Sequence, residues 1–174
     1  MEIGLLLIRL VVGGTIAAHG AQKLFGWFGG FGIAGTGGWL GSMGFRPARL
    51  QAVISGLSEF GGGLLLATGL LTPVGAAAVA GVMLVAVGSV HISNGFFNGS
   101  GGYEFNLVLA SSALALAFTG PGRYSLDNAL GLNLDGAAFG IPAVLAALLV
   151  GGFVLATRKV PEPVEAAAGE RQAA

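Results

Sequence analysis

Residues 3–26 read IGLLLIRLVVGGTIAAHGAQKLFG, and this stretch decides the class of fold. It begins with an apolar run that contains Arg9. Gln22 and Lys23 follow this run within the same stretch. Runs of about 17 to 22 apolar residues, the length of a helix that spans a bilayer, recur along the chain. They lie at residues 3–19, 50–71, 74–92, 103–119 and 137–157. The pattern therefore predicts an all-α, polytopic membrane protein.

The composition indicates the same environment. The chain has 174 residues, of which 54% are hydrophobic and 9% charged, and its mean hydropathy is +0.83. Soluble domains carry about a quarter charged residues, so we expect this chain to lie in lipid. Eight basic and eight acidic side chains cancel, which leaves no basic field for nucleic acid. The chain contains no cysteine, so the electrons of any redox reaction must come from a bound cofactor or a partner protein.

Three regions follow from the pattern. We expect a four-helix transmembrane bundle at residues 1–134, an additional C-terminal transmembrane helix at 135–158 and a disordered polar tail at 159–174. Residues 24–44 are rich in glycine, with aromatic side chains between the glycines. This segment is too apolar for a free loop and too rich in glycine for a stable helix. We therefore predict a re-entrant or interfacial segment, anchored by Trp27 and Trp39.

The basic residues outside the apolar runs predict the orientation, because such residues gather on the cytoplasmic side. With five spans, the segment after the first run and the tail share one side of the membrane. These two regions hold most of the basic residues, namely Lys23, Arg46, Arg49, Arg158, Lys159 and Arg171. The N-terminus is therefore predicted outside and the C-terminus in the cytoplasm.

The few ionisable residues near the apolar runs predict a polar pocket. Such groups are costly in lipid and usually face the interior of a bundle or a water-filled cavity. If neighbouring runs are antiparallel, one end of the bundle holds His19, Lys23, His91 and Glu104. The second run starts at that same end, and Glu59 lies within it. We expect these five side chains to form a ligand pocket inside a bundle of the first four runs.

Arg9 and Glu59 are predicted to form an ion pair at the floor of this pocket. Arg9 lies about 15 Å deeper than His19 on the helix rise, and Glu59 about 13 Å into its own run. Two unpaired charges at this depth would be costly, and pairing removes much of the cost.

Each of these residues also has a simpler interpretation. The ion pair can be purely structural, fixing the register of two helices. His19 and Lys23 can anchor a helix end at the headgroups, Glu104 can favour a helix start through the dipole, and His91 can be solvated.

Four segments of the chain occur in a characteristic order. They are RLVVGGTIAAHGAQKLFG (9–26), SEFGGGLLLATGLLTP (58–73), HISNGFF (91–97) with GGYEFNLVL (101–109), and GPGRYSLD (120–127). This ordered set resembles the DoxX family of small bacterial membrane proteins, and the run at 137–157 lies beyond the resemblance. The resemblance implies a four-helix core in the bacterial inner membrane. It also implies a link with membrane redox systems, among them subunits of thiosulfate:quinone oxidoreductase and an oxidoreductase complex involved in oxidative stress.

The leading functional hypothesis is a redox-associated membrane subunit whose pocket binds a quinone or a similar small ligand. Histidine and glutamate side chains there can relay the protons of quinone reduction. No self-sufficient catalytic motif is present, so whether the chain is itself an enzyme stays open. Partners would be membrane lipid, a soluble or membrane oxidoreductase and a second copy of the chain.

Three alternatives remain. His19, His91, Glu59 and Glu104 offer nitrogen and oxygen ligands for a metal or a haem, although none forms a short-spaced pair. A small-solute or proton transporter would place its site at the charged pocket. A non-catalytic scaffold would dock a soluble oxidoreductase through the glycine-rich segment and the loops.

Overall fold

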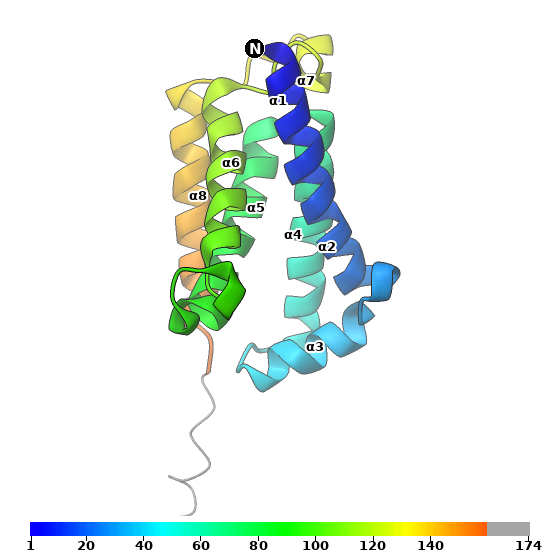
Figure 1. Cartoon of the computed structure of the whole chain (residues 1–174), viewed down its shortest axis with the longest axis vertical. Helices are drawn as coiled ribbons and strands as arrows, with labels where there is room; N and C mark the ends of the chain where they lie inside the picture. Colours follow the sequence, from blue (N-terminus) through cyan, green and yellow to red (C-terminus); the bar gives the residue numbers. More distant parts are fainter. Residues whose placement is uncertain (160–174) are drawn as a thin grey trace, which may run out of the picture.

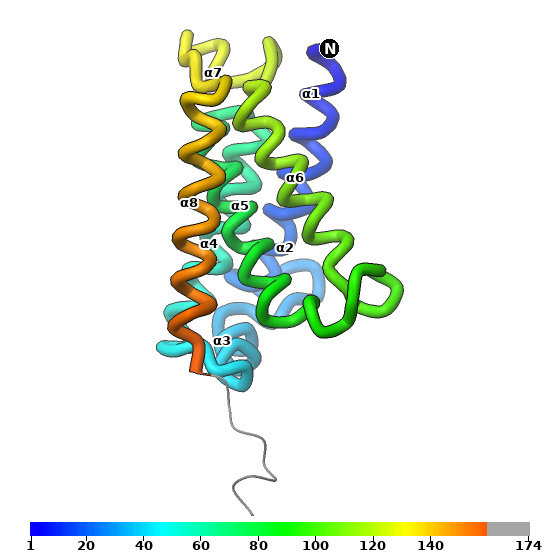
Figure 2. Tube along the Cα trace, turned by 90° about the vertical axis from the view of Figure 1, so that its left-hand side faces the viewer, coloured from blue at the N-terminus to red at the C-terminus, as the bar shows by residue number. Residues whose placement is uncertain are grey.

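The structure is a computed structural model that describes residues 1–159. The tail predicted to be disordered lies, from residue 160 onward, outside the described residues. Throughout the described part the regular elements are helices, without strands. Long helices run antiparallel, side by side, in one bundle (Figures 1 and 2). The first is continuous through α1 (Glu2–Ile8), a π-helical turn (Arg9–Gly13) and α2 (Gly14–Phe25); the others are α4 (Ala48–Thr68), α5 (Thr72–Ala86), α6 (Glu104–Thr119) and α8 (Ala137–Ala156).

Four helices in the described part are long and apolar enough to span a membrane. They comprise Glu2–Phe25, Ala48–Thr68, Thr72–Asn94 and Ala137–Ala156. The fourth predicted run forms the shorter apolar helix α6, of 16 residues. The four qualifying helices are therefore not the first four runs, and a membrane crossing by all five helices stays a prediction.

The helices at the α3 end of the bundle run further than the apolar pattern predicts. The first continues past His19 to Phe25 and ends at Gly26, whose φ of 73° is typical of a helix C-cap. The third extends beyond α5 through a π-helical turn (Val87–His91) and a 3-10 turn (Ile92–Asn94). Polar side chains on one face do not stop a helix whose other faces are apolar.

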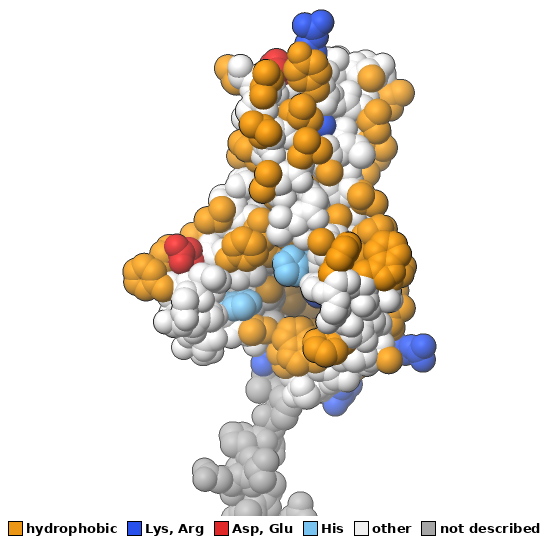
Figure 3. All heavy atoms as spheres, turned by 45° about the vertical axis from the view of Figure 1, so that its right-hand side comes forward, with side chains coloured by type: hydrophobic (Ala, Val, Ile, Leu, Met, Phe, Trp, Pro, Cys, Tyr) orange, Lys and Arg blue, Asp and Glu red, His pale blue; other side chains and the backbone are white. Residues whose placement is uncertain are grey.

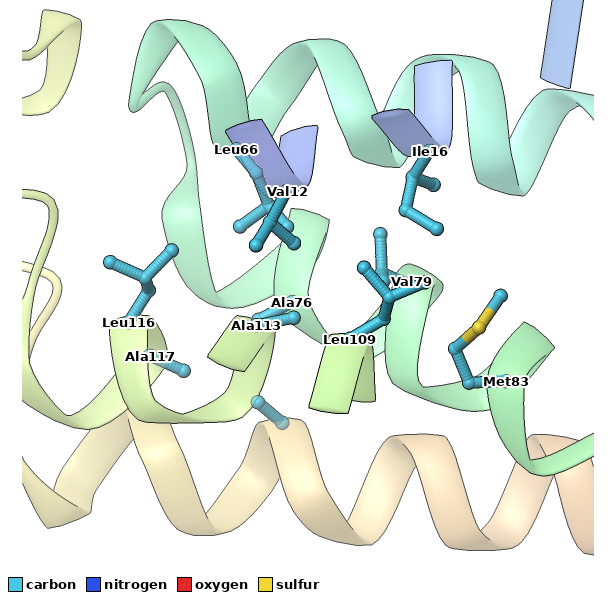
Figure 4. Packing of buried hydrophobic residues seen from close by; sticks show 11 residues of the cluster. Val12, Ile16, Leu66, Ala76, Val79, Met83, Leu109, Ala113, Leu116 and Ala117 are labelled. Carbon is cyan, nitrogen blue, oxygen red and sulfur yellow. The ribbon is translucent and has the colours of Figure 1, made fainter. Parts of the chain in front are cut away.

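The core lies between the first helix, α4, α5 and α6. Val12 and Ile16 of the first helix pack with Leu66 of α4, Val79 of α5 and Leu109 of α6 (Figure 4). Glycines bring the first helix close to α4, because a Cβ at Gly63 would lie 2.5 Å from the backbone nitrogen of Ala17. Small residues at a contact let two membrane helices approach this closely.

The glycine-rich segment contains a helix, contrary to the prediction that it is too rich in glycine for one. A 3-10 turn (Trp27–Gly29) leads into α3 (Gly32–Ser42), which lies across the end of the bundle (Figure 1). Tertiary packing overrides the low helix propensity, because Leu40 is buried against Phe45 and Ala52. Whether the segment is re-entrant or interfacial stays a prediction.

Short elements complete the connections. The α5–α6 loop contains a 3-10 turn (Asn98–Ser100), and the α6–α8 connection contains α7 (Leu126–Ala129) at the end opposite α3 (Figure 2).

Candidate functional site

A cavity of about 500 Å³ lies between α2 and α3. This volume falls within the range of about 300 to 1,000 Å³ that small-molecule sites occupy. The α2 side is polar, and the opposite wall is formed by glycines, two aromatic side chains and the buried Thr36. The lining residues are His19, Gln22, Lys23, Gly29, Gly30, Phe31, Gly35, Thr36 and Trp39.

The polar wall comes from one face of α2. His19, Gln22 and Lys23 are spaced by three and four residues, so they lie one above another on the helix. Gln22 Nε2 donates a hydrogen bond of 3.2 Å to the Phe28 carbonyl and ties the turn after α2 back to this helix. A Cβ at Gly30 would overlap Gln22, so the turn packs directly on α2 only with glycine there.

Lys23 connects the cavity with a buried carboxylate. Its Nζ lies 2.7 Å from Glu59 Oε1 and donates to Ser55 Oγ at 2.8 Å. Glu59 is 3% exposed, and its Oε2 is buried without a hydrogen-bond partner in the described chain. Ser55 and Glu59 stand one turn apart on α4, facing α2. The geometry places an ammonium group between a cavity and a carboxylate with spare acceptor capacity.

The predicted Arg9–Glu59 ion pair is wrong. Arg9 Nε donates to the Leu66 carbonyl at 3.2 Å, Nη2 to Ala67 at 3.1 Å and Nη1 to Pro121 at 2.6 Å. Glu59 pairs with Lys23 instead.

The depth estimate failed in part because the first helix is longer than its apolar run. It ends at Phe25 rather than at His19, and six further residues correspond to about 9 Å along the axis. Lys23 lies 14 residues from Arg9, about 21 Å on the helix rise, so the longer helix explains only part of the difference. The rest arises because the end of the first helix and the start of α4 are not level: Lys23 lies close to the end of its helix, whereas its partner Glu59 lies three turns into α4.

Arg9 and Asp127 hold the opposite end of the bundle together. Arg9 donates to the Leu66 and Ala67 carbonyls in the last turn of α4, where a helix leaves carbonyls without N–H partners of the next turn. Asp127, 1% exposed, caps α5: its Oδ1 accepts from Leu71 N at 2.7 Å, and its Oδ2 accepts from Thr72 N at 3.0 Å and from Thr72 Oγ1 at 2.7 Å. These groups fix the α4–α5 turn and lie away from the cavity.

Asp127 was not predicted as a site residue. The Thr72–Pro73 start of α5 signals a helix N-terminus that needs an acceptor. That acceptor stands 55 residues further along the chain, so no local pattern could identify it.

His91 and Glu104, predicted as walls of the pocket, do not line the cavity. His91 Nδ1 lies 2.7 Å from the Gly101 carbonyl, and Glu104 Oε2 accepts from Asn98 N at 3.0 Å. Both side chains stabilise the α5–α6 loop. Figure 3 shows the two histidines of the chain on one face, close to the same hollow.

The four candidate metal ligands are not brought together. Among residues 1–159, no three or more His, Cys, Asp or Glu side chains are grouped so that they could hold a metal ion. Phe31, Thr36 and Trp39 line the cavity and were not predicted as site residues. Only the mixture of glycine and aromatic residues at 24–44 marked that segment as unusual.

Comparison with known proteins assigns the chain to a family. Residues 4–92, which include most of the first helix, α3, α4 and Glu59, match the family model described as DoxX. The chain belongs to the DoxX family. No solved structure matches the chain.

Two relatives match about three quarters of the chain. "Inner membrane protein YqjF" of Escherichia coli is 34% identical over 131 residues, which are 74% of this chain and 93% of that protein. "Putative oxidoreductase CatD" of Bacillus subtilis is 32% identical over 126 residues, 72% of this chain and 86% of that protein. Together with four apolar helices of spanning length, the first relative supports a multi-pass inner membrane protein.

Proposed function

We propose that this DoxX protein is an integral membrane subunit of a redox system and that its α2–α3 cavity binds a quinone or a similar small ligand. One observation carries the proposal: Lys23 lines the cavity and contacts Glu59, which has a buried oxygen without a hydrogen-bond partner in residues 1–159. Ionisable groups that are buried or held by a specific partner beside a cavity are typical of functional sites.

The lining suits the head group of a quinone. A quinone ring is flat and apolar, with a carbonyl oxygen at each end. The Lys23 ammonium and the His19 imidazole offer donors for these oxygens. Trp39 and Phe31 offer aromatic surface for the ring.

The chemistry assigns a limited role to this chain. Reduction of a quinone to a quinol needs two electrons and two protons. The chain has no cysteine, and we propose that a partner oxidoreductase supplies the electrons. His19, Lys23 and Glu59 would hold and pass the protons. The name of the Bacillus subtilis relative, "Putative oxidoreductase CatD", supports this association.

The test is mass spectrometry of the full chain purified in mild detergent. Wild type is expected to retain a quinone or to bind one that is added, whereas His19→Ala and Glu59→Gln bind it more weakly by about tenfold or more. Arg123→Gln is the matched control, because Arg123 is exposed at the other end of the bundle. A folded wild type that neither retains nor binds quinone would refute the proposal.

A proton or small-solute transporter is the second candidate. The observation that favours it is the Lys23–Glu59 pair at the edge of a cavity, in which Glu59 is buried and Lys23 partly exposed, since charged pairs in membrane bundles are typical of proton relays. Proton flux in liposomes that Glu59→Gln abolishes, without any quinone binding, would favour transport. Co-purification of a soluble oxidoreductase with a ligand-free chain would favour a scaffold.

We also propose that all five helices cross the membrane, with the α3 end in the cytoplasm. Arg46, Arg49, Arg158 and Lys159 support this orientation, because basic residues gather on the cytoplasmic side.

A further inference from the structure

A second cavity, of about 310 Å³, forms an apolar groove between α4, α5 and α8. Apolar side chains from α5 and α8 form most of its walls, and Leu40 and Phe45 close the end near α3. The groove does not share the lining of the α2–α3 cavity. It is thus a separate site on the bundle.

The groove opens toward the surroundings of the bundle. Ile54, Val74 and Val150 line it and are 45%, 56% and 62% exposed. Along α5 the lining extends from Val74 to Val85, which corresponds to about 16 Å of helix. An elongated apolar groove that faces lipid suits an extended hydrocarbon chain.

Two guanidinium groups lie at the α3 end of this groove. Arg158 is centred 5.6 Å from the ring of Phe45, and its Nε donates to the Met43 carbonyl at 2.7 Å. Arg46 Nη1 donates to the carbonyls of Gly41 and Phe45 at 2.9 and 3.3 Å. Phe45 itself lines the groove. The cations therefore stand where the apolar walls end.

These cations have no carboxylate partner in the described chain. Within residues 1–159, the one salt bridge joins Lys23 and Glu59. Each guanidinium carries five N–H donors in a planar fork that matches phosphate geometry. The bonds to backbone carbonyls use part of this donor set and orient the rest.

We propose that the groove binds one anionic phospholipid, with an acyl chain along α5 and α8 and the phosphate at Arg46 and Arg158. Charge complementarity selects the occupant: a zwitterionic lipid carries the same phosphate, but its own cation offsets that charge, whereas an anionic lipid brings net negative charge to the two guanidinium groups. Basic residues at the membrane surface attract anionic lipids. The inference does not depend on the quinone proposal, because the two cavities have different linings.

The test is native mass spectrometry of the full chain, titrated with phosphatidylglycerol and with phosphatidylcholine of identical acyl chains. Phosphatidylglycerol is expected to bind about tenfold more tightly, and added salt should reduce the difference. Arg46→Gln/Arg158→Gln should remove this preference, whereas Arg46→Lys/Arg158→Lys should keep most of it. Arg123→Gln, a change at the opposite end of the bundle, should keep it fully.

A second pair of variants tests the groove. Ala146→Phe adds bulk at a residue that lines it, whereas Leu149→Phe adds bulk at an exposed residue of α8 that does not. Only Ala146→Phe should weaken the binding of both lipids, by about tenfold. If Arg46→Gln/Arg158→Gln fails to fold, Arg46→Gln alone should still reduce the preference. Equal affinity of wild type for the two lipids would overturn the proposal.

Discussion

The Nζ atom of Lys23 lies 2.7 Å from Oε1 of Glu59 and joins the first helix to α4. The two partners differ in exposure, since the side chain of Lys23 is 23% exposed and that of Glu59 4%. Lys23 also faces the α2–α3 cavity, and Glu59 lies behind it. The pair therefore contributes to the packing of two helices and to the chemistry of the candidate site at once.

The asymmetry of this pair predicts unequal effects of its two single variants. Lys23→Met leaves a buried carboxylate without its cation and should lower the free energy of unfolding by about 3 to 5 kcal/mol. Glu59→Gln leaves the partly exposed ammonium of Lys23, so the loss should be about 1 kcal/mol. Denaturant unfolding in detergent micelles measures both values. The double variant should recover most of the loss of Lys23→Met; a simple sum of the two losses would contradict the coupling.

Arg9 is predicted to stabilise the bundle through its shape as well as its charge. Its guanidinium donates to three carbonyls in two segments, and the compact ammonium of lysine cannot reach all three. Arg9→Lys should therefore destabilise the protein by about 2 kcal/mol or more. Arg49→Lys, at an exposed position of α4, should change the midpoint of thermal unfolding little. Equal midpoints for the two variants would show that only the charge of Arg9 matters.

The sequence was sufficient to locate the helices but not their ends. Apolar runs identify spans because lipid demands about 20 apolar residues, and each predicted run corresponds to a helix. The first helix continues beyond its apolar run because the polar side chains of its last two turns, those of His19, Gln22 and Lys23, face a cavity. His19 therefore lies six residues before the end of its helix. This difference, together with helix ends that are not level, explains why Glu59 pairs with Lys23 rather than with Arg9.

The candidate site could be predicted in part for a related reason. His19 and Lys23 line the cavity because both lie on one face of a helix, which spacing alone reveals. His91 and Glu104 bond to their own loop, and loop conformation cannot be inferred from hydropathy. The position of Thr36 depends on the formation of helix α3, which its packing against α4 stabilises. That packing cannot be inferred from the glycine-rich sequence.

The close contact of the first helix with α4 predicts a contrast between two glycines. A Cβ at Gly20 would overlap the backbone of Phe60, whereas a Cβ at Gly14 would meet nothing within 4 Å. Gly20→Ala should cost about 1 to 3 kcal/mol through overpacking. Gly14→Ala should be neutral or slightly stabilising, because alanine is the better helix former. Thermal unfolding of the two variants checks this, and a comparable loss at both positions would argue against a close helix contact at Gly20.

The proposed crossing of all five helices predicts opposite accessibility of the two ends of the bundle. Arg123 lies in the connection between α6 and α8, and Lys159 follows α8. The chain contains no cysteine, so Arg123→Cys and Lys159→Cys each give a protein with a single thiol, and any label on the purified chain must be at that position. In intact cells, a membrane-impermeant maleimide should label Arg123→Cys and leave Lys159→Cys unlabelled until the membrane is opened. The basic residues near α3 require this direction, because they gather on the cytoplasmic side. Labelling of both variants in intact cells would mean that α8 does not cross, and the reverse pattern would mean that the bundle is inverted.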